Sequence, residues 1–168
     1  MKILKIFLTI FAIIVFILLV LFIFGGIIMN KPLISEKEID LEHNVKNIWS
    51  IVVNNSDYKW RSDIKNIVIL DNGKDWIEYY DVNKKYYTTF TLKEKKEYTL
   101  YSFNIENKNF HGTWVGKFIE INENQTKLIF TETIYMKNKI MNVLAKLFWN
   151  LEKIQEKYFI DLIKKLEE

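Results

Sequence analysis

Six short segments rich in β-branched and aromatic residues constrain the fold of this chain more than any other feature. Short polar sequences separate them, and one of these, DNGK, contains the Asn-Gly pair that is typical of a tight hairpin turn. Strands joined by such short links pair with their neighbours along the chain, which predicts an antiparallel meander. The predicted strands are residues 64–70, 76–82, 85–93, 98–106, 110–121 and 127–136.

Elements of other kinds are predicted on both sides of the meander. Residues 34–41 alternate partly as a strand does, and apolar residues in 45–53 follow at helical spacing, with Asn44 placed to cap that helix. After the last strand, residues 140–166 carry one apolar stripe without a proline or a glycine. This stripe predicts a single C-terminal helix, about 40 Å long, that can lie across a curved sheet.

The N-terminal part of the chain has no charged side chain from Ile6 to Met29, a run of 24 residues. As a helix this run would be about 36 Å long, whereas the hydrocarbon core of a bilayer is about 30 Å thick. A cleavable signal peptide is the alternative, but its apolar region usually has about 7 to 15 residues and precedes an A-x-A-like site, which FGGIIMNKPL lacks. We therefore predict that residues 1–30 form a transmembrane anchor and residues 31–168 form one domain.

Lysines on the two sides of the predicted span give almost no preference for its orientation. Lys2 and Lys5 precede it, and Lys31, Lys37 and Lys46 follow it within about 20 residues. A short tail before a first span is typical of a signal anchor, which favours a cytoplasmic N-terminus and a domain outside. The predicted location is therefore that of a single-pass protein of the plasma membrane, with the membrane as one partner.

Charge and residue types argue against several classes of function. Removing Lys2 and Lys5 from the 24 basic residues leaves 22, against 21 acidic residues, and the lysines are dispersed, so we predict no nucleic-acid partner. The chain has no cysteine, and neither His43 nor His111 has a second ligand at metal-binding spacing, so we expect no metal ion. The nucleotide-binding and nucleophile motifs are absent, and we expect no cofactor.

Alternate residues of a strand share one face, so the predicted strands can be searched for a cavity. Phe110, Gly112, Trp114, Gly116 and Phe118 share such a face. Glycine inside a strand marks a bend or the close approach of another group. The two glycines therefore either make room for a ligand or allow the C-terminal helix to pack closely on the sheet.

Two glutamates fall on faces that are otherwise apolar. Glu132 shares its face with Phe130, and Glu78 lies between Trp76 and Tyr80 on another strand. Burial of an ionised carboxylate is unfavourable by several kcal/mol unless it is paired or its pKa rises. Each glutamate is therefore an ion-pair partner, a polar anchor for a ligand, or an acid or base; a shift of one residue in strand phase would instead place both in water.

The chain has one arginine, Arg61, in the segment KWRSDIKN between the predicted helix and the meander. Its planar guanidinium can bind a carboxylate through two parallel hydrogen bonds, which a lysine cannot do. Glu132, Glu78 and Asp63 are the candidate partners. We expect Arg61 to hold the helical segment to the sheet through a carboxylate, with the polar group of a ligand as the alternative partner.

The order strand, short helix, six-strand meander and long helix resembles the helix-grip fold of the START-like superfamily, also called SRPBCC or the polyketide cyclase/dehydrase-like group. The resemblance covers residues 34–168 and is carried by VKNIWSIVVNNSDYKWRSDIKNIVIL, DWIEYY, FHGTWVGKFIEI, TKLIFTETI and the amphipathic C-terminal end. The chain looks most similar to membrane-anchored bacterial members. The resemblance implies an α+β fold in which about seven antiparallel strands wrap around a long C-terminal helix and enclose an apolar cavity for a lipid-like or aromatic ligand.

We therefore expect a membrane-anchored domain that binds a hydrophobic or amphipathic small molecule between the sheet and the C-terminal helix. The alternatives are a cyclase/hydratase-type enzyme that uses a pocket carboxylate, and a protein-interaction module of the cell envelope. Because no catalytic motif occurs, binding is preferred to catalysis and no catalytic residue is assigned. The predicted ligand-binding residues are Trp60, Arg61, Trp76, Glu78, Tyr80, Phe110, Trp114, Phe130, Glu132 and Phe148.

Overall fold

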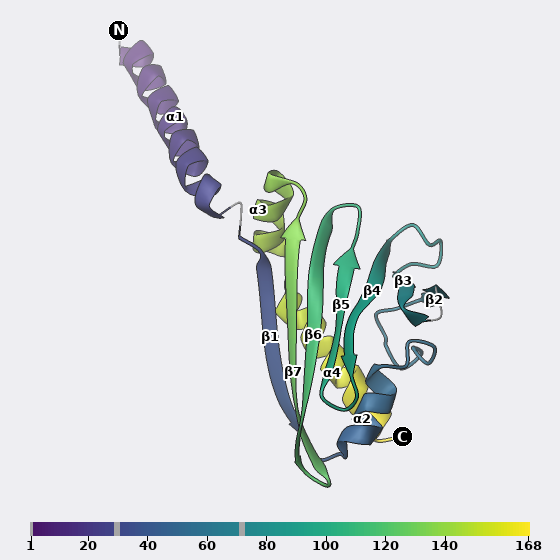
Figure 1. The fold of residues 1–168 in the computed structure, drawn as a ribbon. Helices are drawn as coiled ribbons and strands as arrows, with labels where there is room; N and C mark the ends of the chain where they lie inside the picture. Colours follow the sequence, from purple (N-terminus) through teal and green to yellow (C-terminus); the bar gives the residue numbers. More distant parts are fainter. Residues whose placement is uncertain (1, 29–30, 71–72) are drawn as a thin grey trace.

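The computed structural model describes residues 2–28, 31–70 and 73–168. Within the first helix, the described side chains are those of residues 2 and 5–17. This helix, α1 (Lys2–Ile28), extends away from a seven-stranded antiparallel sheet that is packed against shorter helices (Figure 1). The α+β class predicted from the sequence is therefore confirmed.

The sheet contains the six-strand meander and one additional strand. Its order is β1-β7-β6-β5-β4-β3-β2, so β1 pairs with the last strand and β2 to β7 are each paired with their neighbours along the chain. The predicted hairpin turn between β2 and β3 includes residues 71–72, which lie outside the described residues. The strands are β1 (Leu33–Leu41), β2 (Asn66–Leu70), β3 (Asp75–Tyr79), β4 (Tyr87–Lys96), β5 (Leu100–Glu106), β6 (Phe110–Asn122) and β7 (Gln125–Met136).

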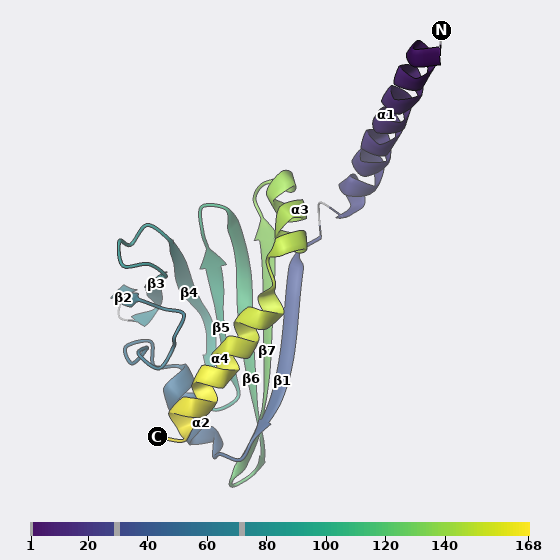
Figure 2. The same cartoon turned by 180° about the vertical axis from the view of Figure 1, so that it is seen from behind.

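Helix α2 (Val45–Val52) forms where the apolar spacing predicts it and covers one end of the sheet (Figure 2). The Asn44 side chain accepts a hydrogen bond of 2.8 Å from the backbone N–H of Lys46, which makes Asn44 the predicted N-cap. The apolar face of α2 is buried, with Ile48 and Trp49 among its buried residues. This helix therefore contributes to the same core as the sheet.

The C-terminal region forms two helices instead of the single helix predicted from the apolar stripe. Helix α3 (Lys139–Phe148) ends at Trp149, whose backbone is extended, and helix α4 (Leu151–Leu166) begins after Asn150. The Asn150 side chain accepts a hydrogen bond of 3.0 Å from the backbone N–H of Lys153 and caps α4. The prediction was wrong because an asparagine N-cap can start a new helix without a proline or a glycine. The break lets α4 cross one face of the sheet while α3 lies beside the end of β7 (Figure 2).

No helix among the described residues is both long and apolar enough to cross a membrane. This finding contradicts the predicted plasma-membrane location, and it gives no support to the predicted transmembrane anchor or membrane partner.

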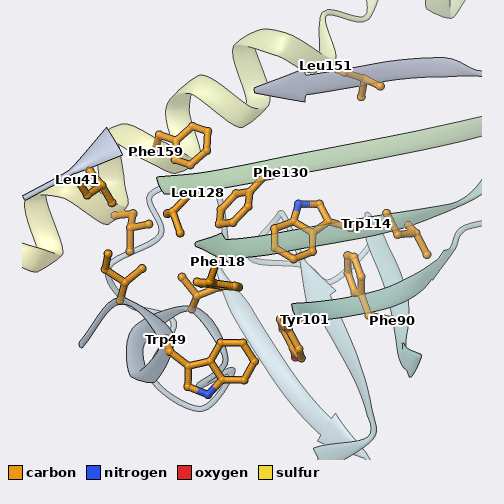
Figure 3. Packing of buried hydrophobic residues seen from close by; sticks show 14 of the residues in the cluster. Leu41, Trp49, Phe90, Tyr101, Trp114, Phe118, Leu128, Phe130, Leu151 and Phe159 are labelled. Atoms are coloured by element: carbon orange, nitrogen blue, oxygen red, sulfur yellow. The ribbon is translucent and has the colours of Figure 1, made fainter. Parts of the chain in front are cut away.

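The hydrophobic core lies between the sheet and helices α2 and α4, and aromatic side chains make its main contacts (Figure 3). Phe130 of β7 stacks on Phe159 of α4, with ring centroids 4.9 Å apart. Trp49 of α2 meets Phe118 of β6 edge to face, with centroids 5.0 Å apart. These contacts place α2 against β6 and α4 against β7, and α4 also packs against β1.

Candidate functional site

A cavity of about 290 Å³ lies between the sheet, helix α4 and the segment that follows α2. Strands β3 to β7 form its floor, and α4 covers it from the other side. Its apolar and aromatic lining consists of Val52, Trp76, Tyr80, Phe90, Tyr101, Phe103, Ile105, Trp114, Phe130, Ile154 and Tyr158. Its other lining residues are polar or charged: Asn55, Arg61, Asp63, Glu78, Glu132 and Gln155.

Most of the predicted ligand-binding residues lie around this one cavity. Those that line it are Arg61, Trp76, Glu78, Tyr80, Trp114, Phe130 and Glu132. They come from β3 and the residue that follows it, from β6 and β7, and from the segment between α2 and β2. Strand pairing thus brings together residues that are up to 71 positions apart in the sequence.

Three predicted residues, Trp60, Phe110 and Phe148, lie elsewhere. The Trp60 ring meets the ring of Tyr158 edge to face at 5.2 Å, so it supports a lining residue without lining the cavity itself. The Phe110 ring packs on Trp149 at 5.1 Å, at the break between α3 and α4. Phe148 is 82% exposed and is the last residue of α3 before the break.

Arg61 is the centre of a buried polar network in the cavity wall. Its Nη1 donates a hydrogen bond of 2.9 Å to Glu78 Oε1, and its Nη2 donates one of 3.0 Å to Asp63 Oδ2. Trp76 Nε1 donates to the same Glu78 oxygen at 3.2 Å, and the guanidinium lies 5.2 Å from the centre of the Tyr158 ring. The expected ion pair between Arg61 and a carboxylate of the sheet is therefore present, with Glu78 as the partner.

The charges in this network stabilise one another. Burial disfavours the charged form of Arg61, but the nearby Glu78 and Asp63 carboxylates outweigh that effect and raise the pKa of the guanidinium. Burial raises the pKa of Glu78, and the positive charge of Arg61 opposes that rise. Two buried atoms of the network, Arg61 Nε and Asp63 Oδ1, have no hydrogen-bond partner in the described part of the chain. The network therefore retains one donor and one acceptor beside the cavity.

Glu132 is in a different situation from Glu78. It lies on β7, directly opposite Trp114 of β6 and Ser35 of β1, and within the described residues it has no hydrogen-bond or ion-pair partner. Burial, and to a smaller extent repulsion from Glu78, raises the pKa of its carboxyl from the ordinary value of 4.5 to about 7. Near neutral pH, Glu132 can therefore either accept or donate a proton.

No family model matches the chain, and no curated protein matches it. Several solved structures do match the chain. One is a START superfamily protein from Mycobacterium smegmatis, which is 14% identical and has a TM-score of 0.61; the match covers 80% of this chain and 97% of that protein. The Zhui aromatase/cyclase from Streptomyces sp. R1128 is 11% identical with a TM-score of 0.63, covering 81% and 94%. Norcoclaurine synthase from Thalictrum flavum, in complex with dopamine and hydroxybenzaldehyde, is 6% identical with a TM-score of 0.63, covering 82% and 88%. The chain has a START-like fold.

Several aromatic residues of the START-like cavity were not predicted from the sequence. Tyr101 and Phe103 share one face of β5 with Ile105, and Phe90 is buried on β4. The alternation on β5 is a period-two signal that could have identified them. Tyr158 lies on α4, where helical spacing cannot distinguish a cavity-lining residue from a core residue.

The tyrosines of the START-like cavity supply neutral hydroxyl groups. Burial raises the pKa of the Tyr101 hydroxyl to about 12 and raises that of Tyr158 as well. Tyr101 Oη accepts a hydrogen bond of 3.3 Å from Asn55 Nδ2. Both hydroxyls therefore stay protonated near neutral pH and can donate hydrogen bonds.

The glycines of β6 make room for neighbouring atoms of the START-like sheet, and not for α4. A β-carbon on Gly116 would collide with the Trp114 ring and lie 3.1 Å from Phe130 Cε1. A β-carbon on Gly112 would collide with the backbone oxygen of Thr133. Gly116 thus lets the Trp114 ring fold against the strand where it lines the cavity.

The structure shows no metal centre among the residues it describes, since no group of three or more His, Cys, Asp or Glu side chains there could hold a metal ion. His111 lies on the exposed face of β6 and stacks on Tyr135 with ring centroids 5.4 Å apart. It therefore takes no part in the cavity.

Proposed function

We propose that the START-like domain binds a small molecule that is mainly aromatic or apolar and carries a polar group, in the cavity between the sheet and α4. The observation that carries this proposal is the lining itself, in which aromatic rings surround the unpaired Glu132 carboxylate and the Arg61 network. A volume of about 290 Å³ is near the lower limit of ligand pockets, about 300 Å³. The size favours a molecule of one or two rings over a long-chain lipid.

Two of the solved neighbours support an aromatic ligand by what their names state. One is an aromatase/cyclase, and the other is in complex with dopamine and hydroxybenzaldehyde. The third alternative from the sequence, a protein-interaction module, predicts a large exposed apolar patch without a cavity. The presence of the cavity favours a small-molecule ligand instead.

A fluorescent dye and a pair of matched variants test this proposal. Ile154 and Ile160 are both on α4 and are 42% and 48% exposed, but only Ile154 lines the cavity. We expect N-phenylnaphthylamine to bind the wild-type chain and Ile160→Trp with similar affinity. In Ile154→Trp the added indole occupies the cavity, and the dye should bind at least about tenfold more weakly.

Absence of dye uptake by a wild-type chain with native near-UV circular dichroism would refute small-molecule binding. Equal binding by Ile154→Trp and Ile160→Trp would show that the dye binds outside the cavity. Either result would favour a filled core over a binding site.

A second candidate function is acid–base catalysis on a bound carbonyl compound, and the unpaired Glu132 favours it. A carboxyl with a pKa of about 7 suits proton transfer near neutral pH. The ionised Glu132 would take a proton from the carbon next to the carbonyl group, and in D₂O the same carbon would receive a deuteron.

The measurement is the rate of deuterium exchange into methyl naphthyl ketone, followed by proton NMR. We expect an acceleration over buffer that increases through about pH 7 and is lost in Glu132→Gln, a variant that keeps the size of the side chain. An exchange rate equal to that in buffer, or retained in Glu132→Gln, would refute catalysis by Glu132 without affecting the binding proposal.

A further inference from the structure

The side chains that line the cavity include more acidic groups than basic groups. Among the lining residues that the structure describes, Arg61 is the one cation, and Glu78, Asp63 and Glu132 are three carboxylates. Arg61 forms ion pairs with Glu78 and Asp63, so these three residues together already carry one excess negative charge. Ionisation of Glu132 adds a second negative charge, and no cation among the described lining residues forms an ion pair with it.

Several hydrogen-bond donors near Glu132 bind other acceptors. Ser35, directly opposite it on β1, donates its hydroxyl to Gln155 Oε1 at 2.8 Å, and Gln155 Nε2 donates back to the Ser35 carbonyl at 3.3 Å. The Nη1 and Nη2 groups of Arg61 donate to Glu78 and Asp63. Glu132 has no hydrogen-bond partner among the residues that the structure describes, so it faces the cavity as an acceptor that a bound donor can reach.

Aromatic rings surround the position next to this carboxylate. Trp114 lies opposite Glu132 on β6, and its ring packs against that of Phe130 with centroids 4.6 Å apart. Tyr101 is on the neighbouring strand, with its ring 6.3 Å from that of Trp114. Ring faces attract cations, and the same rings offer apolar surface to an aromatic ligand.

We propose that the ligand is a protonated amine with an aromatic body, whose ammonium group is held by Glu132 and whose ring packs among Trp114, Phe130 and Tyr101. This inference rests on the proposed binding function and specifies the class of ligand. An ammonium group supplies the hydrogen-bond donors that Glu132 lacks and the positive charge that the cavity lacks. A carboxylate ligand would be repelled by the excess negative charge of the cavity. A neutral alcohol would not offset that charge.

Three probes that share one ring system and differ in charge test the assignment: naphthylethylamine, naphthylethanol and naphthylacetate. Their affinities for the full chain are measured by isothermal titration calorimetry at about pH 8, where an alkylamine such as that of lysine is still protonated. We expect the amine to bind at least about tenfold more tightly than the alcohol, and the carboxylate to bind most weakly.

Glu132→Gln and Glu120→Gln separate the site from a general effect of charge, because Glu120 is an exposed carboxylate on β6 outside the cavity. Glu132→Gln should weaken the binding of the amine at least about tenfold, whereas Glu120→Gln should change it by less than about twofold. An alcohol affinity equal to or above that of the amine in the wild type, or an unchanged amine affinity in Glu132→Gln, would overturn the amine assignment and leave the cavity as a binding site. If none of the three probes binds, both the assignment and the proposed binding function fail.

Discussion

The Arg61 guanidinium donates a 2.9 Å hydrogen bond to Glu78 Oε1 and so joins the segment after α2 to strand β3. The side chain of Glu78 is only 5% exposed, and that of Arg61 is 18% exposed, so the pair is largely removed from water. This contact also makes the two glutamates that face the cavity different from each other. Glu78 has a permanent protein partner, and Glu132 remains available to a ligand.

Loss of the arginine should destabilise the fold. Arg61→Met would leave Glu78 and Asp63 as buried carboxylates without a cation, so we expect the free energy of unfolding in urea to fall by about 3 kcal/mol. Arg61→Met combined with Glu78→Gln should recover part of that loss. Lys96→Met, which removes an exposed ion pair with Glu94, is the control and should have a much smaller effect. An unchanged unfolding midpoint in Arg61→Met would show that the network does not stabilise the domain.

The pH dependence of stability should report the ionisation of Glu132. Between about pH 4.5 and about pH 7 the unfolded chain has lost this proton while the folded chain retains it, so stability decreases as the pH rises. Glutamine does not ionise, so its contribution to stability does not change over this pH range. Glu132→Gln should therefore match the wild type at about pH 4 and be more stable by about 3 kcal/mol at about pH 8.

Urea unfolding of both proteins at several pH values measures this difference. Glu120→Gln removes an exposed carboxylate from the neighbouring strand and controls for the loss of one negative charge. A difference between Glu132→Gln and the wild type that stays constant from about pH 4 to about pH 8 would contradict the raised pKa of Glu132.

The two glycines of β6 should respond differently to alanine. In Gly112→Ala the new methyl group meets the backbone oxygen of Thr133, which cannot move without disturbing the sheet, so we expect a loss of about 2 kcal/mol in thermal or urea unfolding. In Gly116→Ala the methyl group meets the Trp114 ring, a side chain that can rotate. This variant should lose less stability but bind the naphthalene dye more weakly, because Trp114 lines the cavity. The opposite order of stabilities would argue against these contacts.

Removal of the cap at the helix break should loosen α4. Asn150→Ala eliminates the acceptor for the backbone N–H of Lys153, and we expect a destabilisation of about 1 kcal/mol. Asn83→Ala changes an exposed asparagine in the loop between β3 and β4 and serves as the control. Equal unfolding midpoints for Asn150→Ala and Asn83→Ala would show that the cap does not hold the start of α4.

Much of the fold could be predicted because its signals are local. Side-chain alternation along β6 correctly placed Gly112, Trp114 and Phe118 on the buried face, and helical spacing with Asn44 located α2. The same alternation placed Glu132 among buried neighbours on β7. The C-terminal helix was predicted less well, since an apolar stripe continues across Trp149 and Asn150 although the backbone there is extended.

Strand phase and helical period could be read from the order of residues, because both depend on contacts between positions a few residues apart. The distances across the cavity could not be read from the order of residues, since they depend on how seven strands pair and on where α4 crosses them. For this reason the residue order left Glu78, Asp63 and Glu132 as equal candidates for Arg61. The folded chain pairs Arg61 with the first two and leaves Glu132 unpaired among aromatic rings. Side-chain alternation thus identifies Glu132 as a carboxylate on an apolar face. Only the fold shows that Arg61 binds other carboxylates, which makes Glu132 a candidate group for binding a ligand.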